Sequence, residues 1–329
     1  MGGDRHRQLA DDVIHVVAGV LSDARGRILI ARRTAGRDLA GAWEFPGGKV
    51  ESGESALQAL DRELGEELGI RVDAIEPLIA VPQIYPDKRI LLDVHRVLEY
   101  HGTPRGLEKQ ALAWSPSAKL ASYPMPPADI PVVAALNQPA EYLITPDPGD
   151  DDADSDDDFL AKVELALIAG IRRLQLRSRK LPPARLRALA VAMKQRCDHS
   201  GAQLLINGDI ALARELGCGL HLQAAQLAAF DRRSFPAEQL LAASCHDAEE
   251  LRRAQALGAD FVVLGAVATT SSHPGQAALG WRGFAELREQ VSLPIYALGG
   301  LGRGDLPAAR QHGAQGIAAI RGFWPADSA

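Results

Sequence analysis

The sequence predicts an α+β domain followed by an α/β barrel of eight parallel strands, a TIM barrel. The chain has 329 residues, about twice the usual length of a domain, and its 47% hydrophobic content is enough for two cores. Residues 13–134 mix strand-like runs with one strong helix, whereas strand-like and helical segments alternate after residue 139. A proline-rich segment, residues 122–142, lies at this change, so we predict domains at residues 1–138 and 139–329.

Composition excludes several classes of function. A net charge of -6 and a pI near 5.9 give no basic surface for a nucleic-acid polymer, so any nucleotide partner is predicted to be a free small molecule. Cys197, Cys218 and Cys245 are widely spaced without a CxxC pair, which predicts buried thiols rather than disulfides or a zinc site. A polar N-terminus and the lack of any long apolar run predict a cytoplasmic protein with no membrane partner.

The strongest element of the first domain is a helix of about fourteen residues that ends before Gly69. Ser55 and Gln58 have the spacing of a capping box, and leucines at positions 57, 60, 64 and 68 form one apolar stripe. The apolar runs VIHVVAGVL, RILIARR and LLDVHRVLEY around it are typical of strands.

Three glutamates of this helix share one face. At about 100° per residue, Glu63, Glu66 and Glu67 fall within an arc of roughly 100°. Each like-charge pair costs only about 0.2 to 0.5 kcal/mol in water, so spacing alone fits an exposed acidic helix equally well. The preceding loop, residues 45–48, contains two glycines that let backbone carbonyls approach a cation. Together these features favour a hard divalent ion, Mg²⁺ with Mn²⁺ as the alternative.

Residues 48–70 resemble the Nudix signature, which is G, five residues, E, seven residues, then R-E-apolar-x-E-E-x-G-apolar. Every position matches, and an accidental match has a probability of order 10⁻⁸ per start. The matching residues are Gly48, Glu54, Arg62, Glu63, Leu64, Glu66, Glu67, Gly69 and Ile70. The resemblance implies an α+β Nudix fold with a mixed sheet and helices on both sides.

The same resemblance implies roles for the matched residues. Glu63, Glu66 and Glu67 would coordinate the metal together with the Gly47 carbonyl. Arg62 and Glu54 would orient these carboxylates, and Glu63 would help to deprotonate the attacking water.

Longer stretches resemble the MutT branch of that family, which hydrolyses oxidised nucleoside triphosphates: ILIARRTA, WEFPGGKVESGE, GTPRGLEKQALAW and MPPADIP. By this resemblance Glu108 would be a further metal ligand or base, although alone it would be interpreted as an exposed loop acid. Arg33 and Phe45 would line the nucleobase pocket. The predicted substrate-binding set is Arg33, Glu44, Phe45, Pro46, Gly47, Gly48, Lys49 and Asp129.

One difference from the MutT branch concerns recognition of the nucleobase. Asp129 stands where MutT has a base-recognising Asn, and an ionised carboxylate only accepts hydrogen bonds. The hypothesis is a pyrophosphohydrolase that converts 8-oxo-dGTP or a related nucleoside triphosphate to the monophosphate and pyrophosphate. Lys88 and Arg89 fit either phosphate contacts or a basic hairpin tip.

The second domain is predicted from eight strand-like runs: EYLIT, RRLQLR, AQLLIN, GLHLQ, LLAASCH, DFVVLGAV, PIYALGG and QGIAAI. The acidic residues 150–158 follow the first run and are interpreted as a solvated loop. His246, at a strand end, is interpreted as a residue hydrogen-bonded into the strand terminus in preference to an acid or base.

Residues 140–322 resemble thiamine-phosphate synthase in the order of several short motifs. Gly208 stands where the synthase has a metal-binding Asp, the GLHLQAAQ stretch lacks the second Asp, and Arg179 and His273 replace lysines. The retained residues are Gln175, Arg177, Asn207, Thr270 and Ser272. Loss of both carboxylates favours a silent ligand-binding or regulatory module, with a thiamine-pathway compound as its ligand. The alternatives are synthase activity, and a Nudix site that cleaves thiamine-pathway diphosphates.

Overall fold

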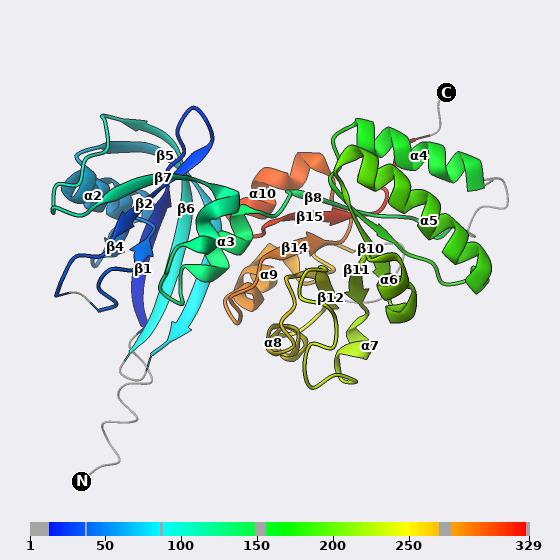
Figure 1. Ribbon diagram of the computed structural model, residues 1–329. Coiled ribbons are helices and arrows are strands. Elements are labelled where there is room, and N and C mark those ends of the chain that lie inside the picture. The colour runs from blue at the N-terminus through cyan, green and yellow to red at the C-terminus, as the bar shows by residue number, and fades with distance from the viewer. Residues whose placement is uncertain (1–12, 37, 86–87, 149–155, 270–277, 327–329) are drawn as a thin grey trace, which may run out of the picture. The chain divides into compact units, whose positions relative to one another are not determined.

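The computed structural model describes residues 13–36, 38–85, 88–148, 156–269 and 278–326 (Figure 1). The chain forms two compact units that divide between Gln138 and Pro139. Each unit has hydrophobic clusters of its own. Within the described ranges, no helix is long and apolar enough to cross a bilayer.

The first unit contains a mixed four-stranded sheet and an antiparallel three-stranded sheet. The mixed sheet has the order β4-β1-β6-β5, in which β1 and β6 are parallel and the other pairs are antiparallel. The second sheet has the order β3-β2-β7. The strands are β1 (Val13–Val20), β2 (Arg27–Arg32), β3 (Trp43–Glu44), β4 (Gly47–Lys49), β5 (Arg71–Ile84), β6 (Arg89–His101) and β7 (Leu112–Pro116).

Helices pack on both faces of the mixed sheet, which confirms the predicted arrangement. Successive side chains of a strand point to opposite faces. Val17 of β1 therefore packs in one core with Leu60 and Leu64, whereas its neighbour Ala18 packs in another core with Val132. The helices are α2 (Ala56–Leu68), the 3₁₀ helix η1 (Ser117–Ser122) and α3 (Ile130–Leu136).

The ends of α2 follow from its sequence. The Ser55 hydroxyl accepts a hydrogen bond from the Gln58 N–H at 3.3 Å, and the Gln58 side chain accepts one from the Ser55 N–H at 2.9 Å. This confirms the predicted capping box. Gly69 ends the helix in a left-handed conformation with φ 68°, and its N–H donates to the Gly65 carbonyl.

The second unit is a closed parallel barrel in which all eight predicted strands are present. Each strand pairs with its neighbour in sequence, and the last strand closes on the first through the pairing of Ala318 with Tyr142. The strands are β8 (Glu141–Ile144), β9 (Arg173–Leu176), β10 (Gln203–Asn207), β11 (Gly219–Leu222), β12 (Leu241–Cys245), β13 (Phe261–Gly265), β14 (Ile295–Leu298) and β15 (Gly316–Ala319).

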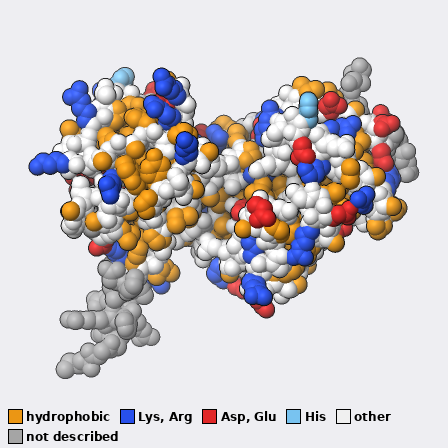
Figure 2. All heavy atoms as spheres, in the orientation of Figure 1, with side chains coloured by type: hydrophobic (Ala, Val, Ile, Leu, Met, Phe, Trp, Pro, Cys, Tyr) orange, Lys and Arg blue, Asp and Glu red, His pale blue; other side chains and the backbone are white. Residues whose placement is uncertain are grey.

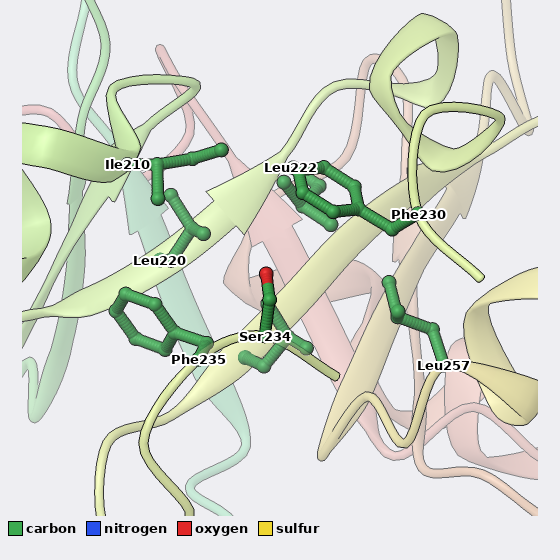
Figure 3. Close-up of a pocket in the computed structure, with 8 residues that line it drawn as sticks. Ile210, Leu220, Leu222, Phe230, Ser234, Phe235 and Leu257 are labelled. Carbon is green, nitrogen blue, oxygen red and sulfur yellow. The ribbon is translucent and has the colours of Figure 1, made fainter. Parts of the chain in front are cut away.

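Helices surround this barrel (Figure 1). They are α4 (Asp156–Ile168), α5 (Pro183–Ser200), α6 (Ile210–Leu216), α7 (Ala224–Leu227), α8 (Ala248–Ala256), α9 (Gly280–Arg288), η2 (Arg303–Asp305) and α10 (Leu306–Gln311). The helix after β11 is only a single turn, so Phe230 and Phe235 from the following loop help to cover the outer surface of β11 and β12. An apolar pocket remains there, and Ser234 is the one polar residue of its lining (Figure 3).

The acidic segment corrects one interpretation. Asp156, Asp157 and Asp158 do not lie in a loop but form the first turn of α4, where carboxylates interact favourably with the helix dipole. Asp156 also pairs with Arg185 at 2.7 Å. Residues 150–155 of the acidic run lie outside the described ranges.

The remaining composition-based predictions concern thiols and surface charge. Cys197, Cys218 and Cys245 are all buried and unbonded, as predicted, and burial raises the pKa of each thiol. On the described surface in view in Figure 2, basic side chains of the second unit are interspersed with acidic ones. That face therefore presents no uniformly basic field.

Candidate active site

The two glycines that precede α2 lie where neighbouring atoms leave no room for a side chain. Gly47 has φ 153°, and a Cβ there would lie 2.1 Å from the Val17 carbonyl oxygen of the neighbouring strand. A Cβ at Gly48 would lie 2.1 Å from the carboxyl carbon of Glu63. The carboxylate of Glu63 therefore lies directly against the backbone of the glycine strand.

Arg62 holds two of the signature carboxylates. Its guanidinium bonds Glu54 at 2.8 Å through Nε and Glu63 at 2.8 Å through Nη1. It also donates to the Lys49 carbonyl at 2.9 Å, which ties α2 to β4. The Arg62 hydrogen bond lowers the pKa of Glu54 to about 2, and Glu54 and Glu63 raise the pKa of Arg62. Arg62 thus contacts both carboxylates, and the orienting role of Arg62 and Glu54 stays a prediction.

The other two helix carboxylates differ in exposure. Glu66 is exposed, whereas Glu67 is only 8% exposed and lines a hollow together with Glu44 and Glu108. In the described part of the chain, no three Asp, Glu, His or Cys side chains are arranged so that they could hold a metal ion as they stand. The ligand roles of Glu63, Glu66 and Glu67 thus stay a prediction.

The loop that carries Glu108 is attached to the C-terminal end of α2. A helix leaves its last carbonyl groups without partners inside the helix. Here the Glu67 carbonyl accepts from the Leu107 N–H at 3.0 Å and from the Gln110 side chain at 2.9 Å. The Leu68 carbonyl accepts from the Arg105 N–H at 3.0 Å. Helix and loop are therefore positioned by direct hydrogen bonds.

Three of the predicted substrate-binding residues, Arg33, Glu44 and Phe45, lie near Asp129. Arg33 pairs with Glu44 and donates to the Asp38 carbonyl at 2.6 Å. The buried Asp129 accepts a hydrogen bond from the Phe45 N–H at 3.1 Å. The Phe45 side chain is 3% exposed and packs in the hydrophobic core. Phe45 contacts Asp129 through its backbone N–H.

Burial decides the charge state of Asp129. Loss of hydration raises its pKa from 3.8 to about 7, although the Phe45 N–H stabilises the charged form. Nearby Glu44 raises the pKa further and Arg33 lowers it. Near neutral pH the side chain therefore exists in both forms, one that only accepts hydrogen bonds and one that also donates.

The barrel contains a chain of neutral hydrogen bonds at the predicted ligand positions. Gln175 donates to the Tyr142 hydroxyl at 2.9 Å and accepts from Asn207 at 3.0 Å. Asn207 in turn accepts from Gln223 at 3.0 Å. Tyr142 also bonds His221, whose pKa burial lowers to about 3, so this ring is neutral. The residues at this position satisfy one another without charge.

The Gly208 backbone is hydrogen-bonded to the GLHLQAAQ stretch, residues 219–226, which lacks the second metal-binding Asp of the synthase. The Gln226 side chain donates to the Gly208 carbonyl at 2.9 Å. Gly208 has φ 72°, and a Cβ there would lie 2.9 Å from the Gln223 amide nitrogen. Arg177 is held by its N–H, which donates to the Thr145 hydroxyl at 3.1 Å.

Among the other candidate site residues of the barrel, the structure describes only His246. Thr270, Ser272 and His273 lie outside the described ranges. His246 is half exposed after β12 and its Nδ1 lies 3.0 Å from Glu250 of α8. Its partner is therefore a helix carboxylate rather than the strand.

Comparisons with known proteins match both units. A NUDIX domain family model covers residues 17–135, and a thiamine monophosphate synthase model covers residues 141–323. The CTP pyrophosphohydrolase of Escherichia coli is 44% identical over 124 residues, which are 38% of this chain and 91% of that protein. The chain belongs to the Nudix family in its first unit and to the thiamine monophosphate synthase family in its second.

Two relatives match the synthase unit. A putative thiamine-phosphate synthase of Geobacter sulfurreducens is 37% identical over 166 residues, which are 50% of this chain and 78% of that protein. A thiamine-phosphate synthase of Thioalkalivibrio sulfidiphilus is 33% identical over 186 residues, 56% of this chain and 86% of that protein. The first unit is thus a Nudix hydrolase acting on phosphoanhydrides, and the second is a thiamine monophosphate synthase domain.

The two domains differ in their fit to a divalent metal. In the Nudix domain, the space that a Cβ at Gly48 would fill holds a carboxylate, and all predicted ligands are oxygens, which suits Mg²⁺ or Mn²⁺. In the synthase domain, the Gln223 amide nitrogen lies 2.9 Å from the place of a Cβ at Gly208, where the resemblance to the synthase implies a metal-binding Asp. Gly208 and the GLHLQAAQ stretch, which both lack the carboxylate that the resemblance implies, therefore do not fit a metal ion bound to a diphosphate.

Sequence reasoning missed Gln110, which contacts the backbone of both Glu67 and Glu108. Its position in the GLEKQ run gives no periodic signal, and an amide in a loop ordinarily faces solvent. The contact becomes visible only when the loop is placed on the end of α2.

Proposed function

We propose that the Nudix domain is a divalent-metal-dependent nucleoside triphosphate pyrophosphohydrolase that releases a nucleoside monophosphate and pyrophosphate. The carboxylate of Glu63, lodged against Gly48 and held by Arg62, is the observation that carries this proposal. Glu67, one helical turn away, opens on a hollow that Glu108 also lines. An oxygen-rich hollow of this kind suits the polyphosphate part of a substrate when a cation is present.

Mg²⁺ or Mn²⁺ would be held by Glu63, Glu66, Glu67, Glu108 and the Gly47 carbonyl, and when bound it neutralises phosphate oxygens and acidifies water. Arg62 and Glu54 fix the orientation of Glu63. Glu63 accepts the proton of the attacking water. Because Glu63 lies against backbone on one side and Arg62 on the other, it can hold this orientation with little loss of side-chain freedom on binding.

Asp129 is the residue that we assign to recognition of the base, next to the Arg33–Glu44 pair. An ionised carboxylate accepts two adjacent N–H groups, which guanine presents with its ring N–H and its amino group. A neutral carboxyl group donates from one oxygen and accepts at the other, which fits the ring nitrogen and amino group of cytosine. The first form fits 8-oxo-dGTP, the substrate that the MutT-like segments suggest.

The second candidate substrate is CTP or a related cytidine nucleotide. The name of the Escherichia coli relative and the raised pKa of Asp129 both favour it. CTP and 8-oxo-dGTP would use the same metal site and the same cleavage reaction. They would require different protonation states of Asp129.

The experiment is Mg²⁺-dependent pyrophosphate release by the purified chain with CTP, 8-oxo-dGTP and dGTP. We expect Glu67→Gln or Glu63→Gln to lower kcat by about a hundredfold or more, because each removes a charged ligand. Glu99→Gln is the matched control, since Glu99 is an exposed residue of β6. Unchanged turnover in both site variants would reject the proposal.

We propose that the synthase domain is a ligand-binding or regulatory module without synthase activity, with a thiamine-pathway compound as ligand. The Gln223 amide supports this, because its nitrogen lies 2.9 Å from where a Cβ at Gly208 would be, in the space that the side chain of a metal-binding Asp would enter. Formation of thiamine phosphate from the pyrimidine diphosphate and the thiazole phosphate would contradict it. Because the two domains share one chain, thiamine-pathway diphosphates belong in the same pyrophosphohydrolase screen, and their preferential cleavage would replace the nucleotide assignment.

A further inference from the structure

We infer that Gln110 is a positioning residue that sets the loop carboxylate Glu108 relative to the helix carboxylate Glu67. The inference rests on the metal-dependent function proposed above for the Nudix domain. It assigns a role to a residue outside the signature helix, and it explains how a loop acid can act together with that helix.

A single amide bridges the two acidic residues. The Gln110 Oε1 atom accepts a hydrogen bond from the Glu108 N–H at 2.9 Å. Its Nε2 atom donates to the Glu67 carbonyl at 2.9 Å. Each bond joins the Gln110 side chain to a backbone atom, so Gln110 fixes where the two main chains lie. All three residues line the same hollow. An amide provides this pairing because it both donates and accepts.

The loop backbone is shaped around this amide. Lys109 lies between Glu108 and Gln110 with φ 64°, a conformation uncommon for a residue with a side chain. A Cβ at Gly106 would lie 2.2 Å from the Gln110 carbonyl oxygen and 3.0 Å from its Oε1. Gly106 therefore permits a tight turn that returns the Gln110 side chain to Glu108. Such local strain persists only where surrounding contacts hold it.

Burial of side chains contributes little to holding the loop that carries Glu108 in place. Leu107 is 57% exposed, and Glu108 and Lys109 are also exposed. The loop is therefore attached chiefly through hydrogen bonds to the end of α2, and one of these is made by the Gln110 side chain. Removing it should let Glu108 move while the backbone bond from Leu107 still holds the preceding residue.

The test is Mn²⁺ binding to the full chain, measured by water-proton relaxation without substrate. Gln110→Met keeps the side-chain length but loses both hydrogen bonds. We expect its Mn²⁺ dissociation constant to rise about tenfold, as found for residues that orient metal ligands. The Mg²⁺ concentration for half-maximal pyrophosphate release should rise by the same factor. Gln290→Met, at an exposed position in the synthase domain, is the control and should leave both values unchanged.

A double-mutant cycle separates positioning from a general effect on folding. If Gln110 acts through Glu108, then Glu108→Gln combined with Gln110→Met should bind Mn²⁺ about as weakly as Glu108→Gln alone. Gln110→Asn, which keeps the amide but is too short to span both bonds, provides a second variant if Gln110→Met does not fold. Additive effects, or unchanged Mn²⁺ affinity in the Gln110 variants, would overturn the inference alone. A wild-type chain that binds no Mn²⁺ would overturn the proposed function and the inference with it.

Discussion

The Nudix and synthase domains of this chain treat the charged positions of their families in opposite ways. In the Nudix domain every charged residue of the signature is present, and Arg62 bonds both Glu54 and Glu63. In the synthase domain Gly208 stands where the resemblance implies a metal-binding Asp, and Gln226 bonds the Gly208 backbone. A retained fold can therefore be combined with a changed set of site residues.

The difference also has an energetic side. Carboxylates gathered on one face repel one another and need a cation or an arginine to offset the repulsion. Ion pairs near solvent contribute little to stability, so the Arg62 network is better explained by orientation of Glu63 than by folding. In the amide chain from Gln175 to Gln223, neighbouring side chains bond one another without a charged group.

The largest expected effect concerns Gly48. Gly48→Ala would place a Cβ 2.1 Å from the Glu63 carboxyl carbon, so the carboxylate must move away. A displacement of this size can cost about a hundredfold in rate, and we expect kcat/KM for pyrophosphate release to fall by at least that factor. Thermal stability should change little, because the end of a flexible side chain can shift at low cost.

Gly65→Ala is the matched control for Gly48→Ala. It is the same substitution within α2, and its Cβ would meet only the Ile70 carbonyl at an ordinary 3.6 Å. This variant should keep its activity and gain slight helix stability. Equal activity in the two alanine variants would show that the close approach at Gly48 has no bearing on catalysis.

The next effect concerns the pH dependence of specificity. The pKa of Asp129 is about 7, so the carboxyl group is mostly neutral below that pH and mostly ionised above it. The ratio of kcat/KM for CTP over that for 8-oxo-dGTP should therefore fall by about tenfold per pH unit at most as pH rises through 7. Asp129→Asn cannot titrate, so its ratio should stay constant with pH. A wild-type ratio that does not vary between pH 5.5 and 8.5 contradicts the assignment of Asp129 to base recognition.

The smallest effect lies in the synthase domain. Gly208→Asp restores a carboxylate at a family position, yet φ 72° there disfavours a side chain and a Cβ would lie 2.9 Å from Gln223. We expect a loss of about 1 kcal/mol in the unfolding free energy by urea denaturation. Gly283→Ala, within α9 and without a close contact, should be neutral or stabilising. Undiminished stability of Gly208→Asp, with new Mn²⁺ binding, would show that the domain still accommodates a metal.

The sequence alone determined much of this protein because its strongest signals are local. A capping box at Ser55, the stop at Gly69 and the leucine stripe define α2 within one stretch of chain, and the signature spacing fixes which face carries Glu63. Alternating apolar runs likewise predicted all eight barrel strands. Backbone hydrogen bonding and side-chain period act over a few residues, so a linear pattern contains them.

Tertiary structure decided what depends on residues far apart in the chain. The burial that raises the pKa of Asp129 and its bond to the Phe45 N–H join positions 84 residues apart. The Gln110 bridge to Glu67 and the amide chain through Gln175 and Asn207 also form between separate elements. Hydration, charge state and hydrogen-bond pairing are properties of a place in the fold, and the order of residues does not specify which groups share that place.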